Sequence, residues 1–381
     1  MTKLGKIAQA VAAAVTVTAS FAVFAAPASA DSDGPSREAV SGPVFVQSDN
    51  EGGNTIVAYD RAGDGSLIQR GIYATGGRGG KLEGAVVDNL ASQSSLTYDS
   101  AHRLLYAVNA GSDTVTVFAV RGDHLIRRQI LSSGGDFPVS VAVHGNRVYV
   151  LNALNGGTLQ GYLNVAGFLV RVPSWHRSLN LDATATPQFT HTPGQVGFTP
   201  DGRKLVVTTK AGGNSFEVFS VGGLGISAKA VITPAPEAVP FGFSFDRTGQ
   251  LVVTEAGRNA VATYRVNRDS HITKIDEKAT GQAATCWVAT VGNYIYAANA
   301  GSGTLTGLQG SRDGSLTSLG TTRTGAGTVD VAASSDGRFL YAQTGVTGSV
   351  DSFRVNADGS LTQVGSVVVP NAVGGEGIVA L

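Results

Sequence analysis

Short stretches of apolar and alternating residues recur along the chain and predict many β-strands. Thr114–Val120 and Ser349–Val355 are typical, because they combine β-branched residues with alternating polar positions. Seven similar strand cores are Val44-Phe45-Val46, Leu105-Tyr106-Ala107, Val148-Tyr149-Val150, Leu205-Val206-Val207, Leu251-Val252-Val253, Ile295-Tyr296-Ala297 and Leu340-Tyr341-Ala342. From Leu105 onward their starts are separated by 43, 57, 46, 44 and 45 residues, and a period near 45 is the length of one four-stranded propeller blade. We find no convincing helical pattern beyond the N-terminal segment.

The pattern therefore predicts an all-β protein, a seven-bladed propeller of four-stranded antiparallel blades over residues 43–381. We name the strands of each blade a to d, from the axis outward. Asp-Gly pairs lie between a and b and between c and d, where they favour two-residue hairpins. The first unit, from Pro43, lacks an a strand, and Gly377–Leu381 has nothing after it. We expect this C-terminal strand to complete the first blade and remove an exposed sheet edge.

The N-terminus is predicted to be a secretory signal peptide over residues 1–30. Lys3 and Lys6 precede an apolar stretch, and Ala28-Ser29-Ala30 is a small-residue cleavage site. An uncleaved anchor is the alternative. Residues 31–42 would be a flexible segment, and the mature protein would be secreted with no membrane span. Cys286 is the only cysteine, so no disulfide can form within the chain.

Composition excludes several classes of function. With 28 basic and 28 acidic residues the formal net charge is zero, which disfavours nucleic-acid binding. Gly-x-Ser-x-Gly is absent, and the six histidines lack the spacing of zinc ligands. No nucleotide-binding glycine motif opens a helix. We therefore expect no metal and no cofactor, and a monomer that binds a small molecule, carbohydrate or peptide.

The last positions of the seven b strands form a polar ring in the predicted fold. Residues 104–120 and 294–310 match at the same offsets and share an Asn there. The ring consists of Ser48, Asn109, Asn152, Thr209, Glu255, Asn299 and Thr344. Each Asn is interpreted as starting a turn or, alternatively, as contacting a ligand at the channel mouth. Glu255, the one ionisable member, is a candidate catalytic carboxylate aimed at that mouth.

The crossings from strand d to the next strand a should lie on the same face as the b–c turns. Two crossings are long, residues 73–93 and 171–195, and each is either functional or a plug of the disc. His191 is a candidate base and Lys210 a candidate positive charge. Further candidate ligand-binding residues in the crossings are Gln93, Gln195, Phe241, Trp287 and Asp330. Cys286 is expected to be a buried hydrophobe.

Several motifs resemble the lactonase-like seven-bladed propellers, the group of 6-phosphogluconolactonase and the carboxymuconate cyclases. The resemblance covers residues 43–381. It is carried by Leu105-Tyr106-Ala107-Val108-Asn109-Ala110-Gly111-Ser112, Gly194-Gln195-Val196-Gly197-Phe198-Thr199-Pro200-Asp201-Gly202, Pro240-Phe241-Gly242-Phe243, Leu251-Val252-Val253-Thr254-Glu255-Ala256, Thr285-Cys286-Trp287-Val288-Ala289 and Asn299-Ala300-Gly301-Ser302-Gly303-Thr304.

The resemblance implies catalytic positions that this chain has largely changed. Enzymatic members use a His, an acid, an Arg-His pair and a Glu. In this chain Gly194 stands at the position of the His, and Thr209-Lys210 stands at the position of the acid. Phe241-Gly242 stands at the position of the Arg-His pair. Only Glu255 is retained in type.

Two functions are indicated as alternatives. One is hydrolysis of a lactone or similar cyclic ester at the channel mouth, with Glu255 or His191 as base and Lys210 as positive charge. The other is a non-catalytic extracellular propeller that binds a sugar, peptide or protein. Quinoprotein-type redox chemistry has no supporting motif.

Overall fold

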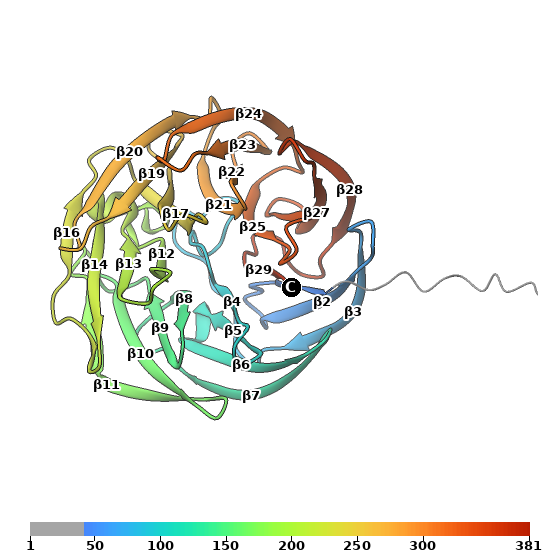
Figure 1. Ribbon diagram of the computed structural model, residues 1–381. Helices are drawn as coiled ribbons and strands as arrows, with labels where there is room; N and C mark the ends of the chain where they lie inside the picture. Colours follow the sequence, from blue (N-terminus) through green and yellow to red (C-terminus); the bar gives the residue numbers. More distant parts are fainter. Residues whose placement is uncertain (1–41) are drawn as a thin grey trace, which may run out of the picture. The chain divides into compact units, whose positions relative to one another are not determined.

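The computed structural model describes residues 42–381, which form seven antiparallel sheets around a central axis (Figure 1). The predicted signal peptide and most of the predicted flexible segment lie outside the described residues. The first three blades, in order a to d, are β29 (Ile378–Ala380), β1 (Pro43–Gln47), β2 (Thr55–Arg61), β3 (Leu67–Ala74); β4 (Leu96–Asp99), β5 (Leu104–Asn109), β6 (Thr114–Arg121), β7 (His124–Ser132); and β8 (Pro138–His144), β9 (Arg147–Asn152), β10 (Thr158–Val165), β11 (Phe168–Ser178).

The remaining four blades repeat the same order around the ring. They are β12 (Gln195–Phe198), β13 (Lys204–Thr208), β14 (Ser215–Gly222), β16 (Val231–Pro234); β17 (Pro240–Phe245), β18 (Leu251–Glu255), β19 (Ala260–Val266), β20 (Ile272–Ala279); β21 (Thr285–Val291), β22 (Tyr294–Asn299), β23 (Thr304–Gly310), β24 (Leu316–Arg323); and β25 (Thr328–Ala333), β26 (Phe339–Thr344), β27 (Ser349–Val355), β28 (Leu361–Val368). The short β15 (Gly225–Ile226) pairs with the end of β14. The predicted fold is thus confirmed.

Burial follows the position of a strand within its blade. The b strands β5 and β26 are buried at every residue, because both faces of a blade pack against neighbouring blades. The outer strand β7 is mostly exposed, with only Leu125 buried. Continuous apolar runs therefore mark the middle of a blade, and mixed runs mark its rim.

Tyrosines in two b strands join their blade to a tight turn of the next blade. The Tyr341 hydroxyl donates to the Gly65 carbonyl at 3.0 Å, and the Tyr296 hydroxyl donates to the Gly359 carbonyl at 2.8 Å. Gly65 has a φ of +94°, and a Cβ there would lie 2.2 Å from the Phe339 ring. Glycine is required at this turn for both its conformation and its lack of a side chain.

Some local predictions differ from the structure. The Asp-Gly hairpins are longer than two residues; the Asp64 carboxylate instead accepts from Ser66 N and Oγ within a loop from Ala62 to Ser66. Residues 171–178, expected in a crossing, extend strand β11, because they pair with β10. Short helical turns also occur: η1 (Ala110–Ser112), α1 (Gln188–His191) and α2 (Lys210–Gly213). They contain about one turn each, too short for a periodic signal.

The C-terminal strand closes the ring as predicted. Strand β29 pairs antiparallel with β1, with Phe45 opposite Val379. Ile378 is 4% exposed and packs with Val44 and Val46. Figure 1 shows the C-terminus beside the first strands of the chain. One blade therefore combines residues from both ends of the described chain.

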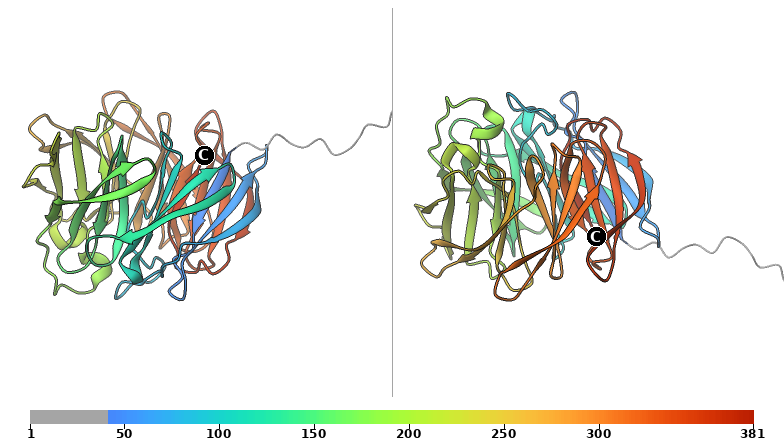
Figure 2. Two further views of the ribbon diagram at one scale, coloured as in Figure 1. Left: turned by 90° about the horizontal axis from the view of Figure 1, so that it is seen from below. Right: turned by 90° about the horizontal axis from the view of Figure 1, so that it is seen from above.

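The two faces of the ring differ in their connections, as the views in Figure 2 show from two sides. We call the side with the b–c turns and d–a crossings the loop face, and the opposite side, with the a–b and c–d turns, the turn face. Loop-face segments meet in one groove, where Val87 lies with Gly301, Gly327 and Val346. On the turn face, Arg61 forms an ion pair with Asp336 at 3.0 Å.

We predict that Ile378→Ala destabilises the protein by about 2–5 kcal/mol, because it leaves a cavity at the closure of the ring. Chemical denaturation measures this free energy of unfolding. Val368→Ala is the matched control: Val368 is 71% exposed on β28, and its truncation should change stability by less than about 0.5 kcal/mol. Equal effects of the two substitutions would contradict this account of closure.

Candidate functional site

The segment from Asp88 to Ser95, here called the crossing segment, traverses the axis on the loop-face side (Figure 1). It belongs to the long connection between β3 and β4. Its backbone bonds reach different blades or crossings: Asn89 N to Gly374 O, Gln93 N to Gly194 O, Val141 N to Ser94 O and Val108 N to Ser95 O. The axis is thus plugged by the first of the two long connections and not by residues 171–195.

Three predicted ligand residues hold the crossing segment in place. The Trp287 indole N–H donates to the Ser92 carbonyl at 2.5 Å, and the Phe241 ring packs edge-on against Trp287 at 5.1 Å between centroids. The Gln93 carboxamide pairs with the Val288 backbone, donating at 2.8 Å and accepting at 3.1 Å. These side chains lie at the mouth where a ligand was expected.

Lys210 is buried beneath the same segment at 1% exposure. Its ammonium donates to the carbonyls of Ala91 and Phe189, both at 2.6 Å, and to Thr192 Oγ1 at 3.1 Å. These three acceptors use all three of its protons. Burial lowers the pKa of Lys210 to about 7, and the nearby acidic groups, Asp88 first, oppose this shift. Lys210 therefore ties the crossing segment to the α1 loop.

Four buried acids, Asp49, Asp88, Asp330 and Glu376, surround the crossing segment near the axis. Burial raises the pKa of Asp88 to about 6 and that of Asp330 to about 7. Burial raises the pKa of Glu376 well above its usual range, and the other three acids raise it further. Several of these carboxyls therefore hold a proton near neutral pH.

Hydrogen bonding independently indicates a protonated Glu376. Ser92 Oγ has one hydrogen but lies 2.9 Å from the Val139 carbonyl and 2.6 Å from Glu376 Oε1. Ser92 N also donates to Glu376 Oε2 at 3.1 Å. If Glu376 carries a proton on Oε1, it donates to Ser92 Oγ, which then donates to Val139. Every group in this arrangement is satisfied.

Within residues 42–381, the acids do not form a group that could hold a metal ion. The same residues include no helix long and apolar enough to span a bilayer.

Two adjoining cavities of about 550 and 440 Å³ lie along the axis between the crossing segment and the turn face. All seven a strands line them, and Gln93, Ser94, Thr97, Val331 and Ala333 belong to both. Ser100 and Ser335, from two a–b turns, also line the larger cavity. The axial space therefore faces the turn face and is blocked at the loop face. We call the two together the axial cavity.

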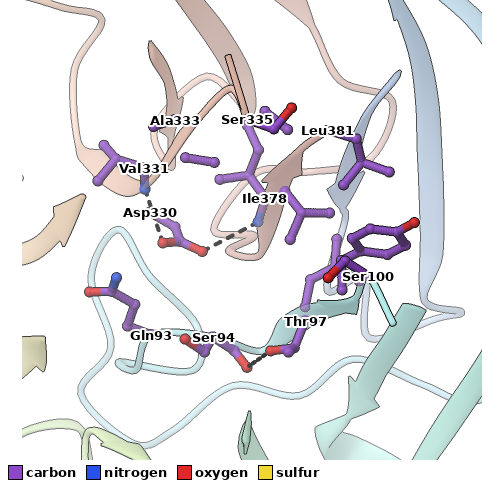
Figure 3. Close-up of a pocket in the computed structure, with 15 residues that line it drawn as sticks. Gln93, Ser94, Thr97, Ser100, Asp330, Val331, Ala333, Ser335, Ile378 and Leu381 are labelled. Atoms are coloured by element: carbon purple, nitrogen blue, oxygen red, sulfur yellow. Dashed lines mark hydrogen bonds between the residues drawn. The ribbon is translucent and has the colours of Figure 1, made fainter. Parts of the chain in front are cut away.

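Of the predicted ligand residues, Gln93, Gln195 and Asp330 line the axial cavity. Figure 3 shows Asp330 and Gln93 at the border of this space. The Asp330 carboxylate accepts from Val331 N at 2.9 Å and Ile378 N at 3.3 Å. The Gln195 carboxamide donates to Ser94 Oγ at 3.1 Å and accepts from Phe243 N at 2.6 Å.

The three ring asparagines are fully buried within the blades. The Asn109 side chain donates to Thr114 and Thr116 hydroxyls and accepts from Asn54. Asn299 likewise bonds the hydroxyls of the following strand, and Asn152 donates to Ser133 O and Thr158 Oγ1. Each carboxamide thus joins the end of its b strand to neighbouring strand or loop groups of the blade, and none of the three residues has the positive φ that the turn interpretation invoked.

Glu255 points away from the axis. Its carboxylate is fully buried, accepts from the Tyr264 hydroxyl and forms ion pairs with Lys274 at 2.7 Å and Arg258 at 3.7 Å. Arg258, Lys274 and Tyr264 line a cavity of about 320 Å³ between blades 4 and 5. Strand side chains alternate between the two faces of a sheet, and in a propeller both faces meet other blades. A b-strand end therefore does not aim at the axis, contrary to the expectation for Glu255.

His191 lies in α1, and its Nδ1 is 3.0 Å from the Pro187 carbonyl and 2.9 Å from Thr190 Oγ1. Its backbone carbonyl packs against Gly212, so its helix lies next to Lys210 and α2. The structure brings the loops of His191 and Lys210 together and leaves Glu255 elsewhere, beside Lys274 and Arg258. Their proposed catalytic roles stay predictions.

Sequence reasoning missed Asp49, Ser92, Ser94 and Glu376 as parts of one centre. Glu376 and Asp88 were considered only as members of crossings. The available signal was a single acid in each of two otherwise uncharged segments, residues 84–96 and 369–381. A lone acid in such a segment needs a buried partner.

We predict that Lys210→Met lowers the free energy of unfolding by about 3 kcal/mol or more, because it leaves buried acceptors without donors. Chemical denaturation measures the loss, and hydrogen exchange should speed up in residues 88–95 and 188–192. Lys229→Met is the control, since Lys229 is exposed. Unchanged exchange in both segments would contradict the role of Lys210 as a tie.

We predict that Glu376→Gln becomes progressively more stable than wild type as the pH rises from 5 to 8. The pKa of Glu376 in the folded state is raised above the unfolded value of about 4.3. Wild type therefore loses stability as the pH rises above that value, because the unfolded state ionises more readily than the folded one, whereas Gln does not ionise. Gln preserves the neutral hydrogen-bond pattern. Melting temperatures of both proteins across this range test the prediction; parallel curves would refute it. Exposed Glu83→Gln should give no such trend.

Comparisons with known proteins identify the fold. No protein-family model matches the chain, and no curated protein matches it. Among solved structures, a candidate 6-phosphogluconolactonase of Bacteroides fragilis is similar, with a TM-score of 0.71 and 18% identity over 89% of this chain and 98% of that one. A candidate 6-phosphogluconolactonase of Bacteroides uniformis has a TM-score of 0.72 and 17% sequence identity, and the match covers 88% of this chain and 98% of that one.

The periplasmic gluconolactonase of Pseudomonas aeruginosa is similar to the same degree. It has a TM-score of 0.71 and 19% identity over 88% of this chain and 98% of that one. At such identities the likeness concerns the arrangement of strands and not the site. Residues 43–381 thus have the fold of the lactonase-like seven-bladed propellers, as the sequence resemblance implied.

Proposed function

We propose that this protein is an exported, monomeric propeller that binds a small, largely apolar ligand in the axial cavity without transforming it. One observation carries the proposal: the crossing segment blocks the axis at the loop face, whereas the axial cavity remains on the turn-face side. The ligand would enter between the a–b turns. Export rests on the basic, apolar and small-residue pattern of residues 1–30.

The size and lining of the axial cavity support ligand binding. Its two parts, about 550 and 440 Å³, are within the range of small-molecule sites. Val331, Ile378 and Phe243 supply apolar contact, while Ser94 and Thr97 supply hydroxyls. An apolar wall with a few polar groups is typical of sites that bind by burial and orient by hydrogen bonds.

We predict that Ala333→Trp abolishes binding of the neutral dye Nile red, because Ala333 lines both parts of the axial cavity and an indole would fill it. Dye fluorescence, titrated with purified mature protein, measures binding. Val86→Trp is the control: it adds the same side chain at a position 80% exposed, on the loop-face connection, and should leave binding intact. Undiminished binding by Ala333→Trp would overturn the proposal.

A second candidate function is hydrolysis of a lactone in the same cavity. Asp330 is the observation that favours this function. Its carboxylate lines the cavity, and a base with a pKa of about 7 is suited to proton transfer at neutral pH. Asp330 would take a proton from water as the water oxygen bonds the lactone carbonyl. The ring C–O bond then breaks, and the departing oxygen receives a proton. The neighbouring solved structures named as gluconolactonases add support.

For this second candidate, Asp330→Asn should reduce kcat for a neutral lactone by at least about 100-fold, since a general base contributes this much. Acid release from gluconolactone, with melting temperature as a check of folding, distinguishes the two functions. Turnover that disappears in the folded variant supports hydrolysis. No turnover by wild type above the spontaneous rate removes hydrolysis of this lactone and leaves binding.

A further inference from the structure

The charged side chains that line the axial cavity are acidic only. Among the residues of the described chain that line its two parts, no side chain is Lys, Arg or His, and Asp330 is the only acidic one. The other lining side chains are apolar, aromatic, hydroxyl or carboxamide groups. A buried anion is stable only when a cation or several donors pair with it. The cavity walls therefore offer a ligand anion no charged partner.

Asp330 itself has unused capacity to accept hydrogen bonds. Its carboxylate oxygens accept from Val331 N and Ile378 N, and Gly377 N also bonds the carboxylate. A carboxylate has about four lone-pair positions, so these backbone bonds still leave room for one donor from the cavity. Figure 3 shows the carboxyl group between Gln93 and Ile378, with Ser94 and Thr97 bordering the same space.

The charged groups that face Asp330 from neighbouring elements are acids. They are Asp88 from the crossing segment, Asp49 after β1 and Glu376 before β29. Lys210, the buried cation nearby, has all three protons committed to Ala91, Phe189 and Thr192. No neighbouring cation among these groups is therefore available to neutralise Asp330. A ligand that brought a positive charge would lower the electrostatic energy of the whole acidic group.

We propose that the axial cavity binds organic cations, primary ammonium compounds with an apolar tail in particular, and rejects anions, with Asp330 as the residue that sets this preference. The inference rests on the proposed function, because it assumes that the ligand occupies the axial cavity. The ammonium would donate to Asp330 and to the Ser94 hydroxyl, while the tail lies against Val331, Ala333 and Ile378. A phosphorylated or carboxylated ligand would be excluded.

The test uses three probes of equal chain length: hexylamine, 1-hexanol and hexanoate. Each displaces Nile red from the mature protein at pH 8 and low salt. We expect hexylamine to displace the dye at a concentration at least about tenfold below that of hexanol, and hexanoate to be the weakest. Asp330→Asn should bring hexylamine to the level of hexanol. Asp201→Asn, at an exposed turn-face carboxylate, is the matched control and should keep the preference.

The outcomes separate the inference from the proposed function. If no probe displaces Nile red, the ligand site is not the axial cavity and both fail. If all three act equally, or hexanoate acts best, the cavity binds ligands but the charge preference is wrong. Should Asp330→Asn fail to fold, wild type decides alone: the advantage of hexylamine over hexanol must grow between pH 6 and 8 as the carboxyl ionises. A constant advantage would overturn the inference.

Discussion

The centre of this propeller depends on satisfying one irregular segment buried at its axis. The crossing segment, Asp88 to Ser95, is not part of any strand, so many of its polar groups depend on bonds from several different blades and crossings. Trp287, Lys210 and Glu376 supply these bonds from three directions. These partners belong to different parts of the ring. The segment therefore links blades that do not contact one another directly, and the same bonds hold the segment in place.

The blades and their closure can be predicted from local patterns in the sequence. Apolar runs such as Leu104–Asn109 recur at one blade length, and the missing first strand could be paired only with residues near Ile378. That Asn109 and Asn299 serve the blade itself could be inferred from their place at strand ends, but their bonds to Thr116 and Thr306 could not, because those depend on strand pairing.

The candidate site was harder to predict because its members are joined only by the fold. Asp49, Asp88, Asp330 and Glu376 are separated by up to hundreds of residues, and none has a periodic neighbour that marks it. Glu255 was misplaced for a geometric reason: the end of a b strand was taken as the rim of the channel, whereas the a strands and the crossing segment form that rim. A ring of end positions therefore describes the blade interfaces and not the axis.

The pairing of β1 with β29 has a consequence for the order of assembly. Residues 43–47 reach their final neighbours only when residues 378–380 join them, so the first sheet waits for a segment more than 300 residues later in the sequence. Contacts of such long sequence separation form late and slow folding. Glu376 and its neighbours arrive with the same last residues, and the burial of the crossing segment is completed with them. The ring thus stays open until residues 378–380 pair with β1, and this one pairing converts a row of blades into a closed ring.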